Sequence, residues 1–84
     1  MDAVTILGLL GGALTTSSFL PQVIKSWKTK STGDVSIWMF LLLTTGIFIW
    51  AVYGFMIGSF PVVVANTFSF ILSVTMIIFK LIYD

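Results

Sequence analysis

The chain has 84 residues, of which 58% are hydrophobic and 8% are charged, and its mean hydropathy is +1.15. A water-soluble domain this short needs many more polar residues to cover its surface, so the composition excludes a soluble fold and predicts a membrane protein. The net charge of +1 is too small to indicate a nucleic-acid partner, and the absence of cysteine and histidine excludes disulfides and removes the commonest metal ligands.

Three apolar segments follow one another along the chain, at about residues 3–24, 37–57 and 60–82. Each is close to the ~20 residues that an α-helix needs to cross a bilayer. We therefore predict an all-α membrane protein, a bundle of three transmembrane helices that forms a single unit over residues 1–84. A polar connection joins the first two spans, whereas Gly58 and Ser59 form a tight turn between the last two.

Lysine is confined to two places, the connection after the first span and the end of the third. The positions are Lys25, Lys28, Lys30 and Lys80. Cytoplasmic segments of membrane proteins carry an excess of positive charge. The pattern predicts a multi-pass protein of the cell (inner or plasma) membrane whose C-terminus and Lys25–Ser36 loop lie in the cytoplasm and whose N-terminus lies outside.

Local signals mark the ends of the spans. Ser36 can cap the second span, and Ser59 followed by Pro61 fits the start of the third, since proline is tolerated in the first turn of a helix. Trp27 and Trp38 flank the lysine loop, either as an aromatic belt, which we favour, or as packing residues.

Each predicted span has one face that is smaller or more polar than the rest, at helical spacing of three and four residues. These stripes are Gly8, Gly12, Thr15, Phe19 and Gln22; Met39, Leu43, Gly46, Trp50, Tyr53 and Ile57; and Asn66, Ser69 and Ser73. Small residues permit close approach of helices in lipid, so we expect Gly8, Gly11, Gly12, Ser69 and Ser73 to serve packing. Packing explains Asn66 less well, because an amide in hydrocarbon usually faces a bundle interior or a water-filled cavity.

Trp50 and Asn66 share a depth in the predicted spans. Trp50 lies seven residues before Ile57 and Asn66 five residues after Pro61, which places them ~10 Å and ~8 Å below the same surface at 1.5 Å per residue. An aromatic face suits the C–H side of a sugar ring and an amide suits its hydroxyls, so the pair can form one site. The spacing equally allows Trp50 as a belt anchor and Asn66 as a helix–helix hydrogen bond.

The chain lacks the residue groups on which enzymes and ion-coupled carriers depend. It has no paired carboxylates, no histidine or cysteine nucleophile and no phosphate-binding glycine loop. Apart from Lys80 near the inner boundary, no ionisable side chain lies inside the predicted spans. We expect a protein that is not an enzyme, needs no cofactor or metal, and offers an uncoupled path.

The end of the first span and the connection that follows it resemble the signature of PQ-loop and MtN3-type membrane proteins, and in particular that of bacterial SemiSWEET sugar transporters. The matching residues are Pro21-Gln22, Lys28, Lys30-Ser31 and Asp34-Val35-Ser36. The resemblance covers essentially the whole chain: three spans, a length below a hundred residues, Pro-Gln at the cytoplasmic end of span one, and a long loop followed by a short one.

The resemblance implies a parallel homodimer with the path on its two-fold axis and one sugar site near the membrane centre. By position, Trp50 and Asn66 look like the substrate pair and Tyr53 like part of an outer gate. The residues that we assign to the inner gate and path are Phe19, Met39 and Leu43, and those that we assign to the hinge are Pro21 and Gln22. The position of Pro21 equally allows a plain helix terminator, and we favour the hinge. Some relatives place a charged pair where this chain has Ile57, Gly58 and Ser59. We therefore expect Tyr53 to be the outer obstruction.

A second copy is also expected on geometric grounds. We expect three helices to pack as a triangle with almost no interior, so a path wide enough for a sugar needs a partner subunit whose axis runs along the membrane normal. The leading hypothesis is a uniporter that moves a small neutral mono- or disaccharide by alternating access. The alternatives are a carrier for another solute such as an amino acid, which the lack of counter-charge disfavours, and a structural or holin-like membrane protein.

Overall fold

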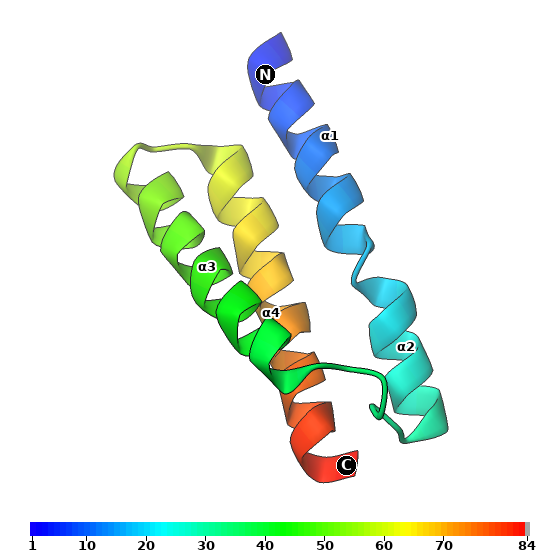
Figure 1. Ribbon diagram of the computed structural model, residues 1–84. Helices are drawn as coiled ribbons and strands as arrows, with labels where there is room; N and C mark the ends of the chain where they lie inside the picture. The colour runs from blue at the N-terminus through cyan, green and yellow to red at the C-terminus, as the bar shows by residue number, and fades with distance from the viewer. Residues whose placement is uncertain (84) are drawn as a thin grey trace.

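The computed structural model describes residues 1–83, which form four α-helices: α1 (Ala3–Ser17), α2 (Leu20–Thr29), α3 (Ile37–Met56) and α4 (Phe60–Tyr83) (Figure 1). Three stretches are long and apolar enough to cross a membrane, because α1 and α2 together make the 27-residue span Ala3–Thr29. The Cα atoms extend over 44 × 21 × 14 Å. The longest dimension is close to the ~40–45 Å thickness of a bilayer with its headgroups, and the predicted all-α membrane fold is confirmed.

The spans lie side by side with α4 between the others, rather than as the predicted triangle (Figure 1). α4 packs against α3 on one side and against α1 and α2 on the other. The predicted triangle was wrong because the face of α1 that carries Gly8 and Gly12 packs against Pro61 and Ala65 of α4 rather than against α3.

Glycine sets the close approach of α1 to α4, as predicted for Gly8 and Gly12. A Cβ atom at Gly8 would lie 2.9 Å from the Cβ of Pro61, and one at Gly12 would lie 2.6 Å from the Cβ of Ala65. Gly11 makes no such close approach, because a Cβ there would meet no atom of the protomer within 4 Å.

Hydroxyl groups complete both helix contacts. Thr16 Oγ1 donates to the Ala65 carbonyl at 3.1 Å and lies 2.9 Å from Ser69 Oγ, while Thr44 and Ser73 share a hydrogen bond between α3 and α4. These contacts confirm the packing roles of the two serines. The residue of α1 that continues the glycine stripe is Thr16, four residues after Gly12, whereas the predicted Thr15 is exposed.

The first span is broken in front of its proline. Ser18 and Phe19 form a tight turn in which the Phe19 N–H binds the Thr16 carbonyl at 3.1 Å, and the helix then resumes as α2 for ten residues. Pro21 lies in the first turn of α2, where its missing N–H costs little, and the N–H that the Ser17 carbonyl would accept is absent. The helix therefore does not end at the proline.

Side chains cap the helices at the expected places. Ser36 Oγ accepts from Met39 N–H at 3.2 Å, and Ser59 Oγ accepts from the first turn of α4, so both predicted caps are confirmed. Asp2 caps α1 by accepting from Thr5 N–H at 2.8 Å. Hydrogen bonds from the side chain and then the backbone of Thr5 lower the pKa of Asp2 below its ordinary value of 3.8.

The loop predicted over residues 25–36 is shorter than expected, because residues 25–29 belong to α2, and the core lies near the remaining residues 30–36 rather than in the middle of the spans. Val35, Phe40 and Met76 are buried there, and the half-buried Phe19 and Val23 pack against them. Residues 30–36 are thus folded onto α2 and α4. We call this the loop end of the molecule, and the opposite end, with residues 57–59 and the start of α1, the turn end.

Candidate functional site

Trp50 and Tyr53 form an exposed aromatic pair on α3. The rings meet edge to face, with centroids 5.3 Å apart and planes at 90°, which is a favourable geometry for two aromatic quadrupoles. They are 57% and 49% exposed, and with Ile49 they line a shallow hollow of about 360 Å³. A flat ring beside an open space offers a stacking surface to a ligand.

Asn66 is half-buried on α4. Its Nδ2 donates to the Val62 carbonyl one turn earlier, at 2.9 Å. Within residues 1–83, this is the one hydrogen bond that the Asn66 side chain makes. The amide oxygen and the second N–H of the side chain are therefore available to a ligand or to water. The interhelical hydrogen bond proposed as its alternative role is absent within the described part of one protomer, since Val62 belongs to the same helix.

The register of α3 against α4 places Trp50 and Asn66 on one level. The two helices are antiparallel (Figure 1), and Gly54 lies opposite Val62, since a Cβ there would be 2.5 Å from Val62 Cγ1. Trp50 is four residues before Gly54 and Asn66 is four residues after Val62. Equal steps along antiparallel helices end at equal depth, so both side chains lie about 6 Å from this contact along the helix axes.

Both residues also lie toward the same side of the protomer. Around α4, Ala65 meets α1, and Phe70 meets Phe48 of α3. At 100° per residue, Asn66 lies about 100° and Phe70 about 140° from Ala65, so Asn66 falls between these two contacts. Around α3, Trp50 is two residues, or 200°, from Phe48. It therefore lies on the other side of the α3–α4 contact from the Phe48–Phe70 pair. We call this side, bounded by α1 and α3 with Asn66 between them, the site face.

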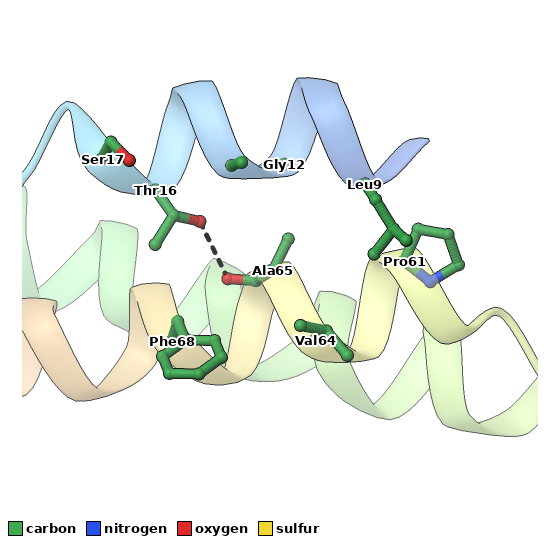
Figure 2. Close-up of a pocket in the computed structure, with 9 residues that line it drawn as sticks. Leu9, Gly12, Thr16, Ser17, Pro61, Val64, Ala65 and Phe68 are labelled. Atoms are coloured by element: carbon green, nitrogen blue, oxygen red, sulfur yellow. Dashed lines mark hydrogen bonds between the residues drawn. The ribbon is translucent and has the colours of Figure 1, made fainter. Parts of the chain in front are cut away.

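A second hollow opens on the opposite side and contains none of the predicted site residues. It lies between α1 and α4, has a volume of about 350 Å³, and is lined mainly by apolar or small groups (Figure 2). Val64 and Phe68 of its lining point 160–200° around α4 from Asn66, at 100° per residue. The Thr16 hydroxyl in its wall is already bonded to the Ala65 carbonyl, so the hollow offers few polar groups.

The remaining predicted residues lie toward the loop end. Met39 and Leu43 are exposed on the same stripe of α3 as Trp50. Phe19 is half-buried, with its ring centroid 6.4 Å from that of Phe40, so part of it belongs to the core. Pro21 and Gln22 lie in the first turn of α2, which begins at Leu20 directly after the break.

Sequence reasoning missed two features of this region. Ile49 lines the aromatic hollow but lies one position outside the stripe that contains Trp50, and only the three-dimensional contact identifies it. Lys80 donates to the Thr32 carbonyl at 3.0 Å, across 48 residues of sequence. The charge of Lys80 indicated orientation, and no local pattern indicated this bond.

Comparison with known proteins defines the class of this fold. The family model of the PQ loop repeat matches residues 3–63, which contain α1, the break, the Pro21-Gln22 pair and α3. The match covers more than half of the chain, so the chain belongs to the PQ-loop family.

Full-length relatives narrow the class. The sugar transporter SemiSWEET of Escherichia coli (strain UMEA 3162-1) is 34% identical over 98% of this chain and 92% of its own length. The crystal structure of a bacterial homologue of SWEET transporters superposes with a TM-score of 0.95 at 42% identity, covering 99% of this chain and 100% of that one. SemiSWEET in the inward-open conformation matches with a TM-score of 0.89 at 34% identity, covering 98% and 88%. The chain belongs to the SemiSWEET family, as its sequence signature predicted.

Proposed function

We propose that this protein is a facilitative transporter that moves a small neutral sugar across the membrane by alternating access as a homodimer. The observation that supports it most directly is the full-length kinship with SemiSWEETs that are named sugar transporters. The chemistry of the site face agrees, since it offers aromatic rings and an amide but no charge at their level.

In the proposed site, Trp50 stacks against the C–H face of the sugar and Asn66 binds its hydroxyls through the amide oxygen and free N–H. Tyr53 lies one turn nearer the turn end, where it obstructs the outer opening. Met39, Leu43 and the exposed part of Phe19 line the inner half of the path. The hinge at Pro21 and Gln22 lets α2 move relative to α1 and so opens the inner end.

A second copy completes the site. In one protomer the Trp50–Tyr53 pair is about half exposed and borders an open hollow, whereas a transport site must enclose its substrate. A copy related by a two-fold axis along the membrane normal presents the same face from the other side. Both copies then insert with the loop end in the cytoplasm of the cell membrane and the N-terminus outside.

The test is sugar flux in proteoliposomes. We expect Trp50→Ala and Asn66→Ala each to lower tracer-sugar uptake by ~10-fold or more, because the loss of stacking or of a hydrogen bond costs about 1–1.5 kcal/mol per contact and the dimer loses it twice. Trp38→Ala is the matched control, since Trp38 is 74% exposed at the loop end, outside the site, and its removal should change uptake less than twofold.

Calorimetric titration with a panel of sugars and amino acids identifies the substrate class. Saturable sugar binding that both site variants lose supports the proposal. Sugar uptake that survives both substitutions at matched protein amount contradicts the assignment of Trp50 and Asn66 to the site. In the titration, binding of amino acids alone favours a carrier for amino acids. Binding of neither class of solute supports a structural membrane protein.

A further inference from the structure

We propose that Lys80 and Lys30 join α2, residues 30–36 and the last turn of α4 into one moving body, which we call the lysine latch, and that Lys80 is a positioning residue for transport. This inference rests on the proposed function, in which α2 moves at the inner end. It assigns a partner to that movement: the C-terminal part of α4.

The first half of the latch is the bond between Lys80 and the loop. Lys80 is half-buried on α4, and its ammonium donates to the carbonyl of Thr32, whose side chain is fully buried. A charged donor makes a stronger hydrogen bond than a neutral one, and partial burial protects it from water. The middle of the loop is therefore fixed to α4 near the inner membrane boundary.

The second half of the latch joins the end of α2 to the end of α4. Lys30 closes α2 in the left-handed conformation, with φ of 54°, which residues other than glycine adopt infrequently. Its Nζ lies 5.1 Å from the centre of the Trp27 ring and 5.4 Å from that of Tyr83, and it donates to the Tyr83 hydroxyl at 3.4 Å. The ammonium thus bridges one aromatic ring from each helix.

The two bonds enclose a shared hydrophobic cluster. Val35 of the loop and Met76 of α4 are buried together, and Val23 of α2 and Phe79 of α4 pack against them. The segment before the break has different partners, because Gly8 and the rest of the α1 stripe pack on the first half of α4. The break at Ser18 and Phe19 therefore separates two attachments, one to each half of α4.

This arrangement means that α2 does not swing alone. Movement of α2 about the break draws the loop and the end of α4 with it, or else it breaks both lysine contacts and exposes the cluster. Because α4 also holds Asn66, the latch connects the sugar site to the inner gate through one helix. A loss of the latch should therefore slow transport without weakening the binding of sugar.

The test compares Lys80→Met with Lys80→Arg and with Lys28→Met. Arginine keeps the charged donor. Lys28→Met removes one positive charge from the loop end of the molecule, at the last turn of α2, and Lys28 has no hydrogen bond or ion pair with any of residues 1–83. We expect Lys80→Met to lower sugar flux at least fivefold with the binding constant within twofold of wild type, and the other two variants to keep flux within twofold. Wild-type flux in Lys80→Met, or equal losses in Lys80→Met and Lys80→Arg, would overturn the proposal.

A second measurement needs no sugar. The chain has no cysteine, so a spin label on Thr29→Cys reports one distance between the two α2 ends of a dimer in liposomes. Lys80→Met and the double variant Lys30→Met with Tyr83→Phe should broaden this distance distribution, and Lys28→Met should not. An unchanged distribution in both latch variants overturns the proposal. If no sugar crosses the membrane but the distribution broadens as expected, the latch stands and the proposed function fails.

Discussion

Single glycines decide how closely the helices approach, and their neighbours in space decide which of them are needed. Gly12 faces Ala65 across the α1–α4 contact, whereas Gly11, one residue earlier, faces open space in the protomer. Glycine in the middle of a helix is itself unfavourable by about 0.5–1 kcal/mol relative to alanine. A glycine inside a helix therefore lowers the stability of that helix, and a close contact with a neighbouring helix is what makes it necessary.

Gly12→Ala should destabilise the fold. The new Cβ would lie 2.6 Å from that of Ala65, far inside the ~3.5–4.0 Å optimum for carbon atoms, so α1 must shift outward. Overpacking of this kind costs about 1–3 kcal/mol, more than the gain in helix propensity. Thermal unfolding in detergent, followed by circular dichroism, should show a lower Tm.

Gly11→Ala is the control for that measurement. It adds the same methyl group one residue away, where the protomer leaves room, so its Tm should equal or exceed that of the wild type. Equal losses of Tm in the two variants would show that the close approach at Gly12 is not what limits α1.

Among the elements, the first span is distinctive because it has two halves with separate attachments. A proline usually kinks a helix one turn before itself, since the carbonyl four residues earlier loses its donor. Here that carbonyl belongs to Ser17, and the helix is interrupted at the next two residues before α2 starts at Leu20, one residue before Pro21. Pro21 therefore accounts for the break, because it removes the donor to the Ser17 carbonyl. The position of the break also depends on the tight turn at Phe19.

Pro21→Ala should impair transport more than sugar binding. Alanine restores the N–H that the Ser17 carbonyl lacks and favours a continuous helix, which stiffens the junction between α1 and α2. We expect a several-fold loss of flux in proteoliposomes, slower hydrogen exchange at the amides of residues 20 and 22, and a binding constant within about twofold of wild type.

Pro61→Ala provides the comparison, because Pro61 lies in the first turn of α4, where its missing N–H interrupts no helical bond. Its exchange pattern around residues 20–22 should match the wild type. A Pro21→Ala protein that binds sugar and transports at the wild-type rate would contradict the hinge at Pro21 and Gln22.

Local signals predicted the elements well, because each of them depends on neighbours in the sequence. The caps at Ser36 and Ser59 follow from hydroxyl groups placed beside an apolar run, and the spans follow from length and hydropathy. The order of the helices across the bundle was not predictable in the same way. Helical spacing shows which residues share a face, but not which neighbour that face meets. Thr16 was therefore missed as a contact with α4, and a triangle was predicted where the helices lie in a row.

The same limit applies to the site face. The common depth of Trp50 and Asn66 follows from residue counts alone, because both are measured from one turn at residues 57–59. Their common side depends on the rotation of α3 against α4, which the Phe48–Phe70 and Gly54–Val62 contacts set. The Lys80–Thr32 bond links positions 48 residues apart and has no signal in either local sequence.

At the scale of the whole molecule, charge is excluded from the middle of the bilayer. The charged side chains of the described residues are Asp2 at the turn end and Lys25, Lys28, Lys30, Asp34 and Lys80 at the loop end. Lys25 and Asp34 pair with each other at 3.6 Å in an exposed position that contributes little to stability. Among the described residues, the level of Trp50 and Asn66 therefore holds only neutral groups.

A transporter with this distribution should equilibrate its sugar and never concentrate it. Carriers driven by protons or sodium place carboxylates or other ion-binding groups at the level of the substrate, so that ion and substrate bind together. In proteoliposomes with an imposed proton or sodium gradient, we expect internal tracer sugar to rise to the external concentration and stop there, as it does without a gradient. Accumulation above the external level that an ionophore abolishes would contradict uniport. It would require an ion site built from the neutral oxygens of the site face, of which the Asn66 carbonyl is the first to test by substitution.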